Sequence, residues 1–340
     1  MIALDVQNVL LCGTQYGRVY LPAIYEQPGI ELAGILARGS VRSVRLAEQA
    51  GVPLFHEVNE LDEPIDMACV AVGEEIGLGM ALKLLQKKIP VLIEHPISVT
   101  GCQQLLQAAT EAGVPCHING HFADLPPAVD FVKAATRLNA AYRPLVVTGS
   151  ANPRTLYSWL DMLMRAFGSG ELKNLNLQTP GNAQDYSVCT FQLNEMPVSL
   201  TLQNWIGAED DSKDAPLGHQ FSVTYPIGNL QLTGTYGQCI WNPLVAAVAD
   251  RSIPCSFTGP GPVNAVIAQL TDWRIKANQK AISQLLAEAI RKGTPVRHQS
   301  AKYLKALTTA WSAIKKALPQ QTRPAIPEAV PGRLWNVFGP

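Results

Sequence analysis

Short, continuous apolar runs alternate with amphipathic helical patterns over the first 120 residues, and this alternation constrains the fold more than any other feature. Strands of a parallel sheet that has helices on both faces are buried on both sides, so they are apolar without interruption. The apolar runs cover residues 9–12, 32–36, 67–72 and 91–93, and the helical stretches cover 41–50, 77–87 and 103–112. We therefore predict a doubly wound α/β domain over residues 1–120, with its ligand crevice at the carboxyl ends of the strands.

The pattern changes after residue 120, where one amphipathic stretch (156–167) precedes strand-like runs separated by turn residues. Such a series is typical of a mostly antiparallel sheet. The runs cover residues 172–179, 187–193, 198–206, 220–225 and 229–235, and helices are expected over 263–292 and 300–318 before an extended, proline-rich tail. Residues 121–340 are thus expected to form an α+β domain for substrate binding and oligomerisation. We interpret the run 198–206 as apolar on both faces, which favours a homodimer through this sheet.

Charge and cysteine content narrow the class of protein. Lys plus Arg and Asp plus Glu each number 27, so the formal net charge is zero, which argues against a nucleic acid partner. No apolar run approaches the ~20 residues of a membrane helix, and the N-terminus lacks the basic region of a signal peptide. The seven cysteines are odd in number, contain no C-x-x-C pair, and several lie in apolar runs. We expect reduced thiols and a cytoplasmic protein.

A glycine-containing loop follows the first predicted strand and indicates a dinucleotide site. Gly13 permits a tight turn, and Gly17 lets the next helix pack against the strand. The backbone N–H groups that can face a pyrophosphate are those of Thr14, Gln15 and Tyr16. The spacing departs from G-x-G-x-x-G, so an ordinary strand-to-helix turn is the alternative. The position after the first strand favours a Rossmann-type cofactor site.

The end of the second predicted strand favours NADP over NAD. NAD sites usually place a carboxylate here, whereas this chain has Ala37 followed by Arg38, Ser40 and Arg42. Positive charges and hydroxyl donors suit a 2′-phosphate, although a basic helix start in solvent is the alternative. Residues expected to contact the same cofactor from the other strand ends are Val72, Glu94 and His95.

Histidines near the predicted crevice are candidates for proton transfer. His95 follows a strand and precedes Pro96, and imidazole is the side chain that most often moves protons near neutral pH. A structural histidine is the alternative. His117 and His121 have the H-x3-H spacing of a metal pair, but that spacing aligns two rings only on a helix. The local sequence indicates a strand and then a loop, so we predict no metal site.

Several of these motifs resemble the Gfo/Idh/MocA oxidoreductase superfamily. The resemblance lies in three places: residues 17–23, residues 72–79 and the triplet Glu94-His95-Pro96. Sugar-oxidising members have Glu-Lys-Pro at the triplet, and an Asp and a His at the positions of Arg154 and Ser158. The alcohol-oxidising set is therefore missing here. The chain is more similar to the thiazolinyl imine reductases of siderophore biosynthesis, over most of residues 8–310. The segments shared with them are the loop 13–17, the triplet 94–96, and residues 156–163, 204–205, 219–234 and 236–241.

This resemblance implies a cytoplasmic enzyme that uses NADPH to reduce a thiazoline C=N bond to a thiazolidine. The substrate would be tethered to a carrier domain of a nonribosomal peptide synthetase, and the residues expected on its side are Phe122, Tyr157 and His219. The family is thought to use a tyrosine as proton donor, and Phe122 stands at that position. His95 is then the first candidate for the acid, His121 the second and His219 a weaker third.

Other functions stay open at this point. A dehydrogenase of a sugar or another small carbonyl would need an acid–base pair that the motifs lack, and an NADP-binding sensor without catalysis would explain Phe122. A carrier domain is typically acidic, so we expect it to dock at a basic face near the C-terminus, for which a solvated helix face is the alternative. The basic residues of that face are Arg291, Lys292, Arg297, Lys302, Lys305, Lys315 and Lys316.

Overall fold

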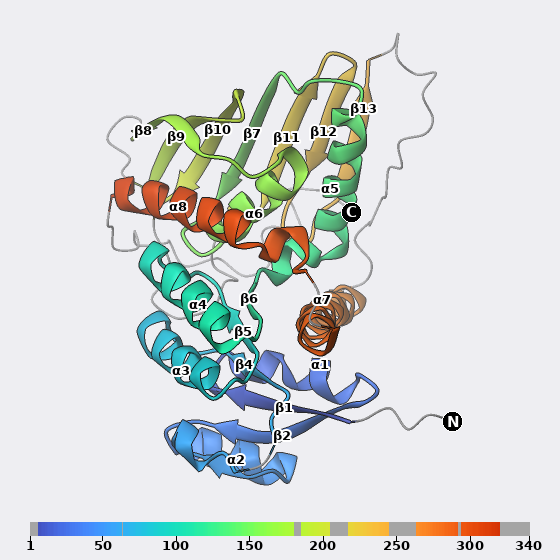
Figure 1. Ribbon diagram of the computed structural model, residues 1–340. Helices are drawn as coiled ribbons and strands as arrows, with labels where there is room; N and C mark the ends of the chain where they lie inside the picture. Colours follow the sequence, from blue (N-terminus) through green and yellow to red (C-terminus); the bar gives the residue numbers. More distant parts are fainter. Residues whose placement is uncertain are drawn as a thin grey trace.

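Two β-sheets lie at opposite ends of the protein, with a layer of helices between them (Figure 1). The computed structural model describes residues 6–62, 64–179, 185–204, 217–244, 263–291 and 294–319. The proline-rich tail and Cys255 lie outside these residues, and the six described cysteines are buried free thiols. Among the described helices, none has both the length and the apolar character that a membrane crossing requires.

The N-terminal sheet has six parallel strands in the order β3-β2-β1-β4-β5-β6, which confirms the predicted doubly wound domain. Its strands are β1 (Gln7–Cys12), β2 (Ile30–Leu36), β3 (Leu54–Phe55), β4 (Met67–Val70), β5 (Val91–Glu94) and β6 (Cys116–Asn119). The strand order reverses between β1 and β4, and such a switch point opens a crevice at the carboxyl ends of the strands.

Helices on both faces cover this sheet. The helices are α1 (Leu21–Tyr25), α2 (Val41–Ala50), α3 (Glu74–Gln86) and α4 (Val99–Ala112), with the 3-10 turns η1 (Gly17–Val19), η2 (Val58–Glu60) and η3 (His121–Asp124). Ser40 and Ser98 begin α2 and α4 as N-caps, since each hydroxyl accepts a backbone N–H three residues on. Gly51 and Gly113 end them in the left-handed conformation.

The C-terminal sheet has seven strands in the order β13-β12-β11-β7-β10-β9-β8. Its strands are β7 (Val146–Ala151), β8 (Leu172–Gln178), β9 (Tyr186–Leu193), β10 (Met196–Gln203), β11 (Gln220–Tyr225), β12 (Gly228–Leu232) and β13 (Cys239–Pro243). The pair β7 and β10 is parallel and the other described pairs are antiparallel, so the predicted mostly antiparallel sheet is confirmed. The sequence patterns missed β7 and β13.

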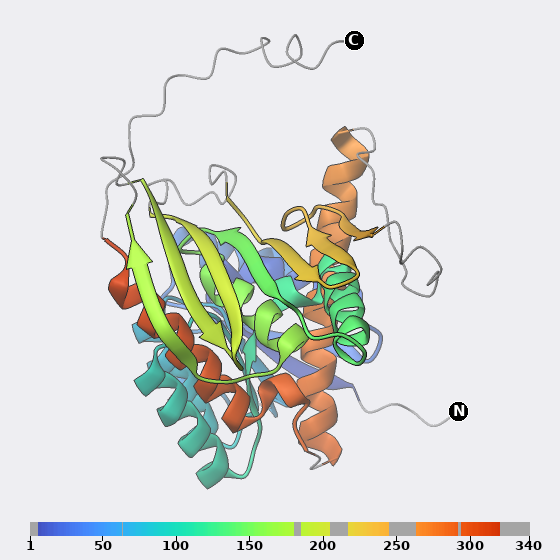
Figure 2. The same cartoon turned by 90° about the horizontal axis from the view of Figure 1, so that it is seen from above.

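One face of this sheet packs on three helices, and no described helix covers its other face (Figure 2). The packed helices are α5 (Pro126–Asn139), α6 (Leu156–Phe167) and α8 (Ala301–Ala317). In β10 the inward Val198, Leu200 and Leu202 are buried, while Thr201 on the other face is exposed. The interpretation of this strand as apolar on both faces is therefore wrong. The homodimer loses that argument and stays a prediction.

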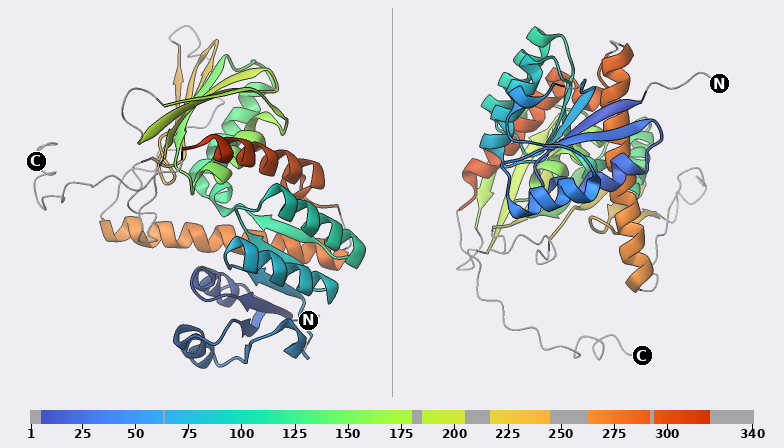
Figure 3. Two further views of the ribbon diagram at one scale, coloured as in Figure 1. Left: turned by 90° about the vertical axis from the view of Figure 1, so that its left-hand side faces the viewer. Right: turned by 90° about the horizontal axis from the view of Figure 1, so that it is seen from below.

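Helix α7 (Val263–Arg291) comes late in the sequence but lies against the N-terminal sheet (Figure 3). Its Ile282 and Leu285 are fully buried in one cluster with Val9 and Leu11 of β1. A parallel sheet needs apolar cover on both faces, and α1 has only five residues. The long α7 therefore completes the cover that α1 leaves unfinished, and it borders the crevice.

Candidate active site

The loop after β1 has the geometry of a pyrophosphate cradle. Gly13 has φ +89°, and a Cβ there would lie 2.6 Å from Cγ2 of Val72 and 2.8 Å from the Ala71 carbonyl oxygen. A Cβ on Gly17 would lie 3.3 Å from Leu11, so this glycine brings η1 close to the strand. Three successive loop N–H groups donate to no acceptor in the described chain. They belong to Thr14, Gln15 and Tyr16. Free N–H groups beside a glycine with positive φ fit a bound dinucleotide.

The basic residues after β2 lie at the carboxyl edge of the sheet, as does the loop after β1. Arg38 and Arg42 are exposed, whereas Ser40 uses its hydroxyl to cap α2 by accepting a backbone N–H at 3.3 Å. His56, which the sequence patterns missed, lies beside them with Nδ1 3.2 Å from the Ala37 carbonyl oxygen. It follows β3, the strand that pairs with β2, and this pairing is the signal that could have identified it.

Glu94, His95 and His121 converge at the carboxyl ends of β5 and β6. Their candidate ligand atoms all lie within 4.8 Å of one another, and both histidine side chains are almost fully buried. One carboxylate oxygen of Glu94 accepts hydrogen bonds from the Tyr20 hydroxyl at 2.6 Å and from Asn119 Nδ2 at 2.9 Å. This network links β5, β6 and the start of α1 into a fixed floor for the crevice.

His95 is held in one tautomer by the backbone. Its Nδ1 lies 2.6 Å from the Asn119 carbonyl oxygen, which can only accept, so Nδ1 carries the proton. Burial lowers the pKa of His95, partly offset by this hydrogen bond. The ring is therefore mainly neutral at pH 7, with Nε2 as an acceptor. His95 therefore differs from the solvent-exposed imidazole that moves protons near neutral pH, because the protein removes its ring from water.

Aromatic rings surround His95 and separate the predicted substrate residues into two groups. Tyr157 stacks on His95 at 5.3 Å between centroids, is 1% exposed, and meets Trp311 on its other side. It supports His95 from the protein interior. Phe122 lies edge-on to His95 at 6.0 Å and 4.2 Å from the His121 ring. Phe122 is the one of these rings that is only partly buried, so a ligand can reach it.

His219 is fully buried behind Phe122, with its ring centroid 5.1 Å away. Its Nε2 lies 2.6 Å from the Ser158 hydroxyl and its Nδ1 lies 2.9 Å from the Thr235 hydroxyl. Burial, with a smaller contribution from the neighbouring His95, lowers the pKa of His219 to about 3. With both ring nitrogens engaged and no charge, His219 positions its neighbours and is a poor proton donor.

Comparison with known families agrees with this geometry. Residues 7–120 match the family described as "Oxidoreductase family, NAD-binding Rossmann fold" (Gfo/Idh/MocA). This part of the chain is therefore similar to the Gfo/Idh/MocA oxidoreductases. Residues 143–242 match the family described as "Thiazolinyl imine reductase Irp3-like, C-terminal". No curated protein matches the chain.

Solved structures share the whole fold. An oxidoreductase from Agrobacterium radiobacter, in complex with NAD+, L-tartaric acid and magnesium, has a TM-score of 0.71 at 12% identity, covering 92% of this chain and 96% of its own. A dehydrogenase from Chromobacterium violaceum has a TM-score of 0.70 at 14% identity, with the same coverage. The WlbA dehydrogenase from Bordetella pertussis, in complex with NADH and UDP-GlcNAcA, has 0.68 at 12%, covering 92% and 95%. At these identities the likeness shows the fold.

His117 and His121 have different partners in the structure. His117 Nε2 lies 2.7 Å from Glu288 of α7. The sequence patterns missed that His121 instead meets His95 and Glu94. These three side chains have the donor types of a divalent cation site. Since His95 Nδ1 and one Glu94 oxygen already hydrogen-bond to protein groups, we assign the cluster to proton handling.

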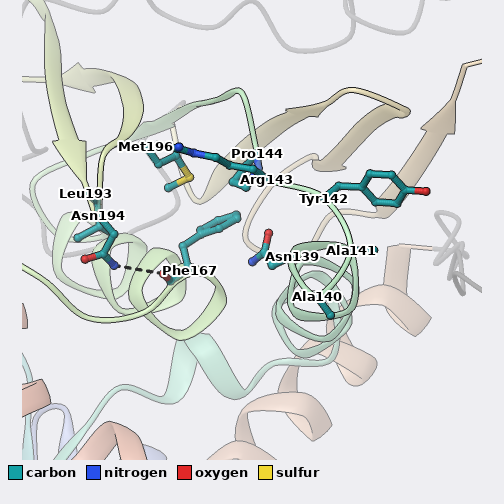
Figure 4. A pocket seen from close by; sticks show the side chains of 10 residues that line it. All are labelled: Asn139, Ala140, Ala141, Tyr142, Arg143, Pro144, Phe167, Leu193, Asn194 and Met196. Atoms are coloured by element: carbon teal, nitrogen blue, oxygen red, sulfur yellow. Dashed lines mark hydrogen bonds between the residues drawn. The ribbon is translucent and has the colours of Figure 1, made fainter.

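A separate cavity of about 340 Å³ lies at the far end of α6 (Figure 4). Helix α6 begins beside His95 with Tyr157 and ends at this cavity with Phe167, roughly 15 Å away at 1.5 Å per residue. Asn194 closes one side by donating to the Phe167 carbonyl at 3.3 Å. The buried ionisable groups gather in the crevice and not here, so the chemistry belongs to the crevice.

Burial of Glu94 predicts a pH-dependent stability. Burial raises its pKa from 4.5 to about 8, against the lowering effect of the Tyr20 and Asn119 hydrogen bonds. Between these two pH values the folded protein holds a proton that the unfolded chain releases, so stability falls as pH rises through this window. Glu94→Gln keeps a carbonyl for Tyr20 and has no proton to lose. We expect it to exceed the wild type by on the order of 5 kcal/mol near pH 9 and by less than about 1 kcal/mol near pH 5.

Thermal melting of both proteins across this pH range measures the difference. Glu57→Gln, at an exposed glutamate paired with Lys83, serves as the control and should melt in parallel with the wild type at every pH. Parallel curves for Glu94→Gln and the wild type would show that Glu94 is ionised in the folded protein.

Proposed function

We propose that this chain uses NADPH to reduce a thiazoline C=N bond to a thiazolidine. The observation that carries the proposal is the match of residues 143–242 to the C-terminal domain of thiazolinyl imine reductases. The crevice chemistry supports it, because the helix position at which sugar-oxidising relatives have a histidine is Ser158, whose hydroxyl bonds to the buried His219. An imine reductase needs one proton donor and does not need the Asp and His that the sugar-oxidising relatives have in this helix.

Imine reduction requires a hydride at carbon and a proton at nitrogen, and the bound nicotinamide supplies the hydride. The loop N–H groups after Gly13 bind the pyrophosphate, and the network of Glu94, Tyr20 and Asn119 holds the floor of the crevice. His95 gives up its proton from Nε2 when it is in the imidazolium form. Because burial lowers the pKa of His95, its imidazolium is a stronger acid than an imidazolium in water. This suits the weakly basic thiazoline nitrogen.

Oxidation of NADPH at 340 nm with a synthetic 2-aryl-thiazoline as substrate, offered as the thioester and as the free carboxylate, tests the proposal. Turnover with formation of the thiazolidine is the expected result. Cofactor binding without turnover of any thiazoline would instead favour a sensor without catalysis.

A dehydrogenase is the second candidate, and the resting state of His95 is the observation that favours it. A neutral imidazole with Nε2 as acceptor is ready to remove a proton from an alcohol. Running the assay in the oxidative direction, with NADP+ or NAD+ and nucleotide sugars, separates the two activities.

We propose NADPH over NADH because Arg38 and Arg42 lie exposed at the end of β2 with no carboxylate between them. Arg38→Ala should weaken NADPH binding by roughly 1–3 kcal/mol, the size of a charge-assisted hydrogen bond, and leave NADH binding unchanged. Fluorescence titration of both cofactors measures the effect. Arg137→Ala, an exposed arginine of α5, is the control and should change neither affinity. Tighter binding of NADH than NADPH by the wild type would rule out this preference.

We further propose that a carrier domain delivers the substrate to the basic face of α8. Lys302, Lys305, Lys315 and Lys316 are exposed there, as is Arg297 just before the helix, whereas the side chains of Arg291 and Lys292 lie outside the described residues. Reversing Lys315 and Lys316 to Glu should slow turnover of a carrier-tethered thiazoline about tenfold at low salt, since steering raises association rates. A soluble thiazoline should be turned over normally. Lys173→Glu, on β8, is the matched reversal that should change neither rate. Equal slowing of both substrates would argue against docking at α8.

A further inference from the structure

Arg274 of α7 is a partly buried cation with no anionic partner among the described residues. Its Nε is completely buried and has no hydrogen-bond acceptor. Its guanidinium carbon lies 5.5 Å from the centroid of the Tyr236 ring, and the guanidinium also hydrogen-bonds to the Tyr236 side chain. Burying a polar N–H without an acceptor costs free energy. The side chain is thus held where a ligand can complete its hydrogen bonds.

The acidic side chains of the neighbouring elements already have cationic partners. Asp272 lies 2.7 Å from Lys276 on the exposed side of α7. Asp124 of η3 lies 3.1 Å from Arg165 and also contacts Lys280. These pairs leave no nearby described carboxylate to neutralise the guanidinium.

Arg274 lies beside the candidate proton donors. Helix α7 packs on η3, the turn that contains His121 and Phe122. Trp273, next to Arg274 in the sequence, is buried in one cluster with Phe122 and Tyr236. The charge of Arg274 is close enough to lower the pKa of His121, after the larger effects of burial and of His95. The guanidinium therefore belongs to the wall of the crevice.

The other ionisable groups of this crevice are mainly neutral near pH 7. Burial raises the pKa of Glu94 to about 8, so its carboxyl is mostly protonated. Burial also lowers the pKa values of His95 and His121, so both rings are uncharged. Beside these neutral groups, Arg274 is a positive charge that no described carboxylate neutralises, and electrostatics favours a ligand with a negative group at that point.

We infer that Arg274, resting on the ring of Tyr236, binds an anionic oxygen group of the ligand in the crevice, either a carboxylate or a phosphate. The planar guanidinium presents paired N–H donors that match both groups. Two molecules can bring such a group: a substrate free of its carrier through its carboxylate, or the cofactor through its pyrophosphate. Tyr16 of the cofactor loop is also within range of the charge of Arg274, so both sources are near. The inference rests on the proposed function only for the choice of carboxylate probe.

The test measures binding and needs no turnover, so it stands even where thiazoline reduction fails. Dissociation constants are measured for NADPH, and then in the presence of NADP+ for thiazolidine-4-carboxylate and its uncharged carboxamide. Arg274→Met keeps an unbranched side chain over Tyr236 and removes the charge, and Arg274→Lys keeps the charge without the paired donors. Lys276→Met is the control for charge on α7, because Lys276 lies two residues after Arg274 and is paired with Asp272. Far-ultraviolet circular dichroism and melting confirm that each variant folds.

Arg274→Met should weaken one anionic ligand by roughly 10- to 100-fold, as expected for the loss of a charged hydrogen-bonding group. Arg274→Lys should recover part of that loss, and Lys276→Met should bind as the wild type does. Weaker binding of the carboxylate with unchanged carboxamide binding identifies the substrate as the source, and weaker binding of NADPH identifies the cofactor. The inference is overturned when the dissociation constants of Arg274→Met and of the wild type agree within twofold for both NADPH and thiazolidine-4-carboxylate. If neither protein binds the carboxylate detectably, the two proteins count as equal for that ligand.

Discussion

Replacing His95 by glutamine should lower kcat by roughly 10²–10⁴, the range typical of a lost general acid, while NADPH binding stays nearly intact. Glutamine can still donate to the Asn119 carbonyl, which His95 Nδ1 meets at 2.6 Å, so the floor of the crevice keeps its shape. What the variant loses is the proton at Nε2. Stopped-flow measurement of NADPH oxidation at saturating thiazoline reports this step directly.

The pH dependence of the same rate identifies the donor. Because burial lowers the pKa of His95, its imidazolium fraction should fall about tenfold for each pH unit above that pKa. The wild-type rate should therefore rise as pH falls, and this rise should be absent in His95→Gln. A variant that keeps both the rate and its pH dependence would show that His95 only shapes the nicotinamide pocket.

Two further histidine variants separate the alternatives. His121 has a buried Nδ1 without a hydrogen-bond partner, so it is the other donor that could replace the tyrosine missing at Phe122. If His121→Gln lowers kcat more than His95→Gln, His121 is the acid. His117→Gln is the control, because His117 is equally buried but pairs with Glu288 at 2.7 Å and lies outside the cluster of Glu94, His95 and His121. It should change stability without changing the pH dependence of kcat.

Gly13→Ala should weaken NADPH binding roughly 1,000-fold, about 4 kcal/mol. The added Cβ would lie 2.6 Å from Val72 and 2.8 Å from the Ala71 carbonyl oxygen, so the loop has to move away from β4. That movement withdraws successive loop N–H groups from the pyrophosphate, and each hydrogen bond to a charged group contributes about 1.5–3 kcal/mol. The positive φ of +89° adds backbone strain for any residue with a Cβ.

Gly29→Ala separates strain from the steric clash. Gly29 also has a positive φ of +76°, but nothing lies within 4 Å of a Cβ placed there. Gly29→Ala should lower the melting temperature, because a residue with a Cβ is strained at a positive φ. It should leave the dissociation constant of NADPH unchanged. Titration of both variants measures the contrast, and a Gly13→Ala protein that bound NADPH like the wild type would show that the loop after β1 does not contact the cofactor.

Much of the fold could be predicted because its signals are local. The helix over 41–50 and the helix over 156–167 have the predicted bounds, since apolar periodicity, the Ser40 cap and Gly51 or Gly168 at the ends act over one or two turns. Strands β7 and β13 were missed because their side chains alternate weakly. Strand β7 holds Thr148 and Gly149 at its centre, and tertiary pairing with β10 and β11 on its two sides makes it a strand.

The sequence indicated several of the candidate site residues but not the surroundings of their side chains. The sequence placed Gly13, Glu94 and His95 at strand ends, where a doubly wound sheet gathers its ligand groups. The sequence contained no sign that His219 would form a hydrogen bond of 2.6 Å with Ser158, because these residues come from different parts of the chain. It also left Arg274 and His56 out, since each is an unremarkable charged or polar residue until the fold brings it beside Tyr236 or Ala37.

By itself, then, the sequence determined the two sheets, the cofactor loop and the histidines, because periodicity, glycines and turn residues act between neighbours in the chain. Only the tertiary structure decided which of these side chains are charged. Burial depends on contacts between distant segments, and the removal of water raises the pKa of Glu94 and lowers those of His95, His121 and His219. The same burial leaves Arg274 as the positive charge of the crevice, because ion pairs elsewhere on α7 and η3 take up the nearest carboxylates.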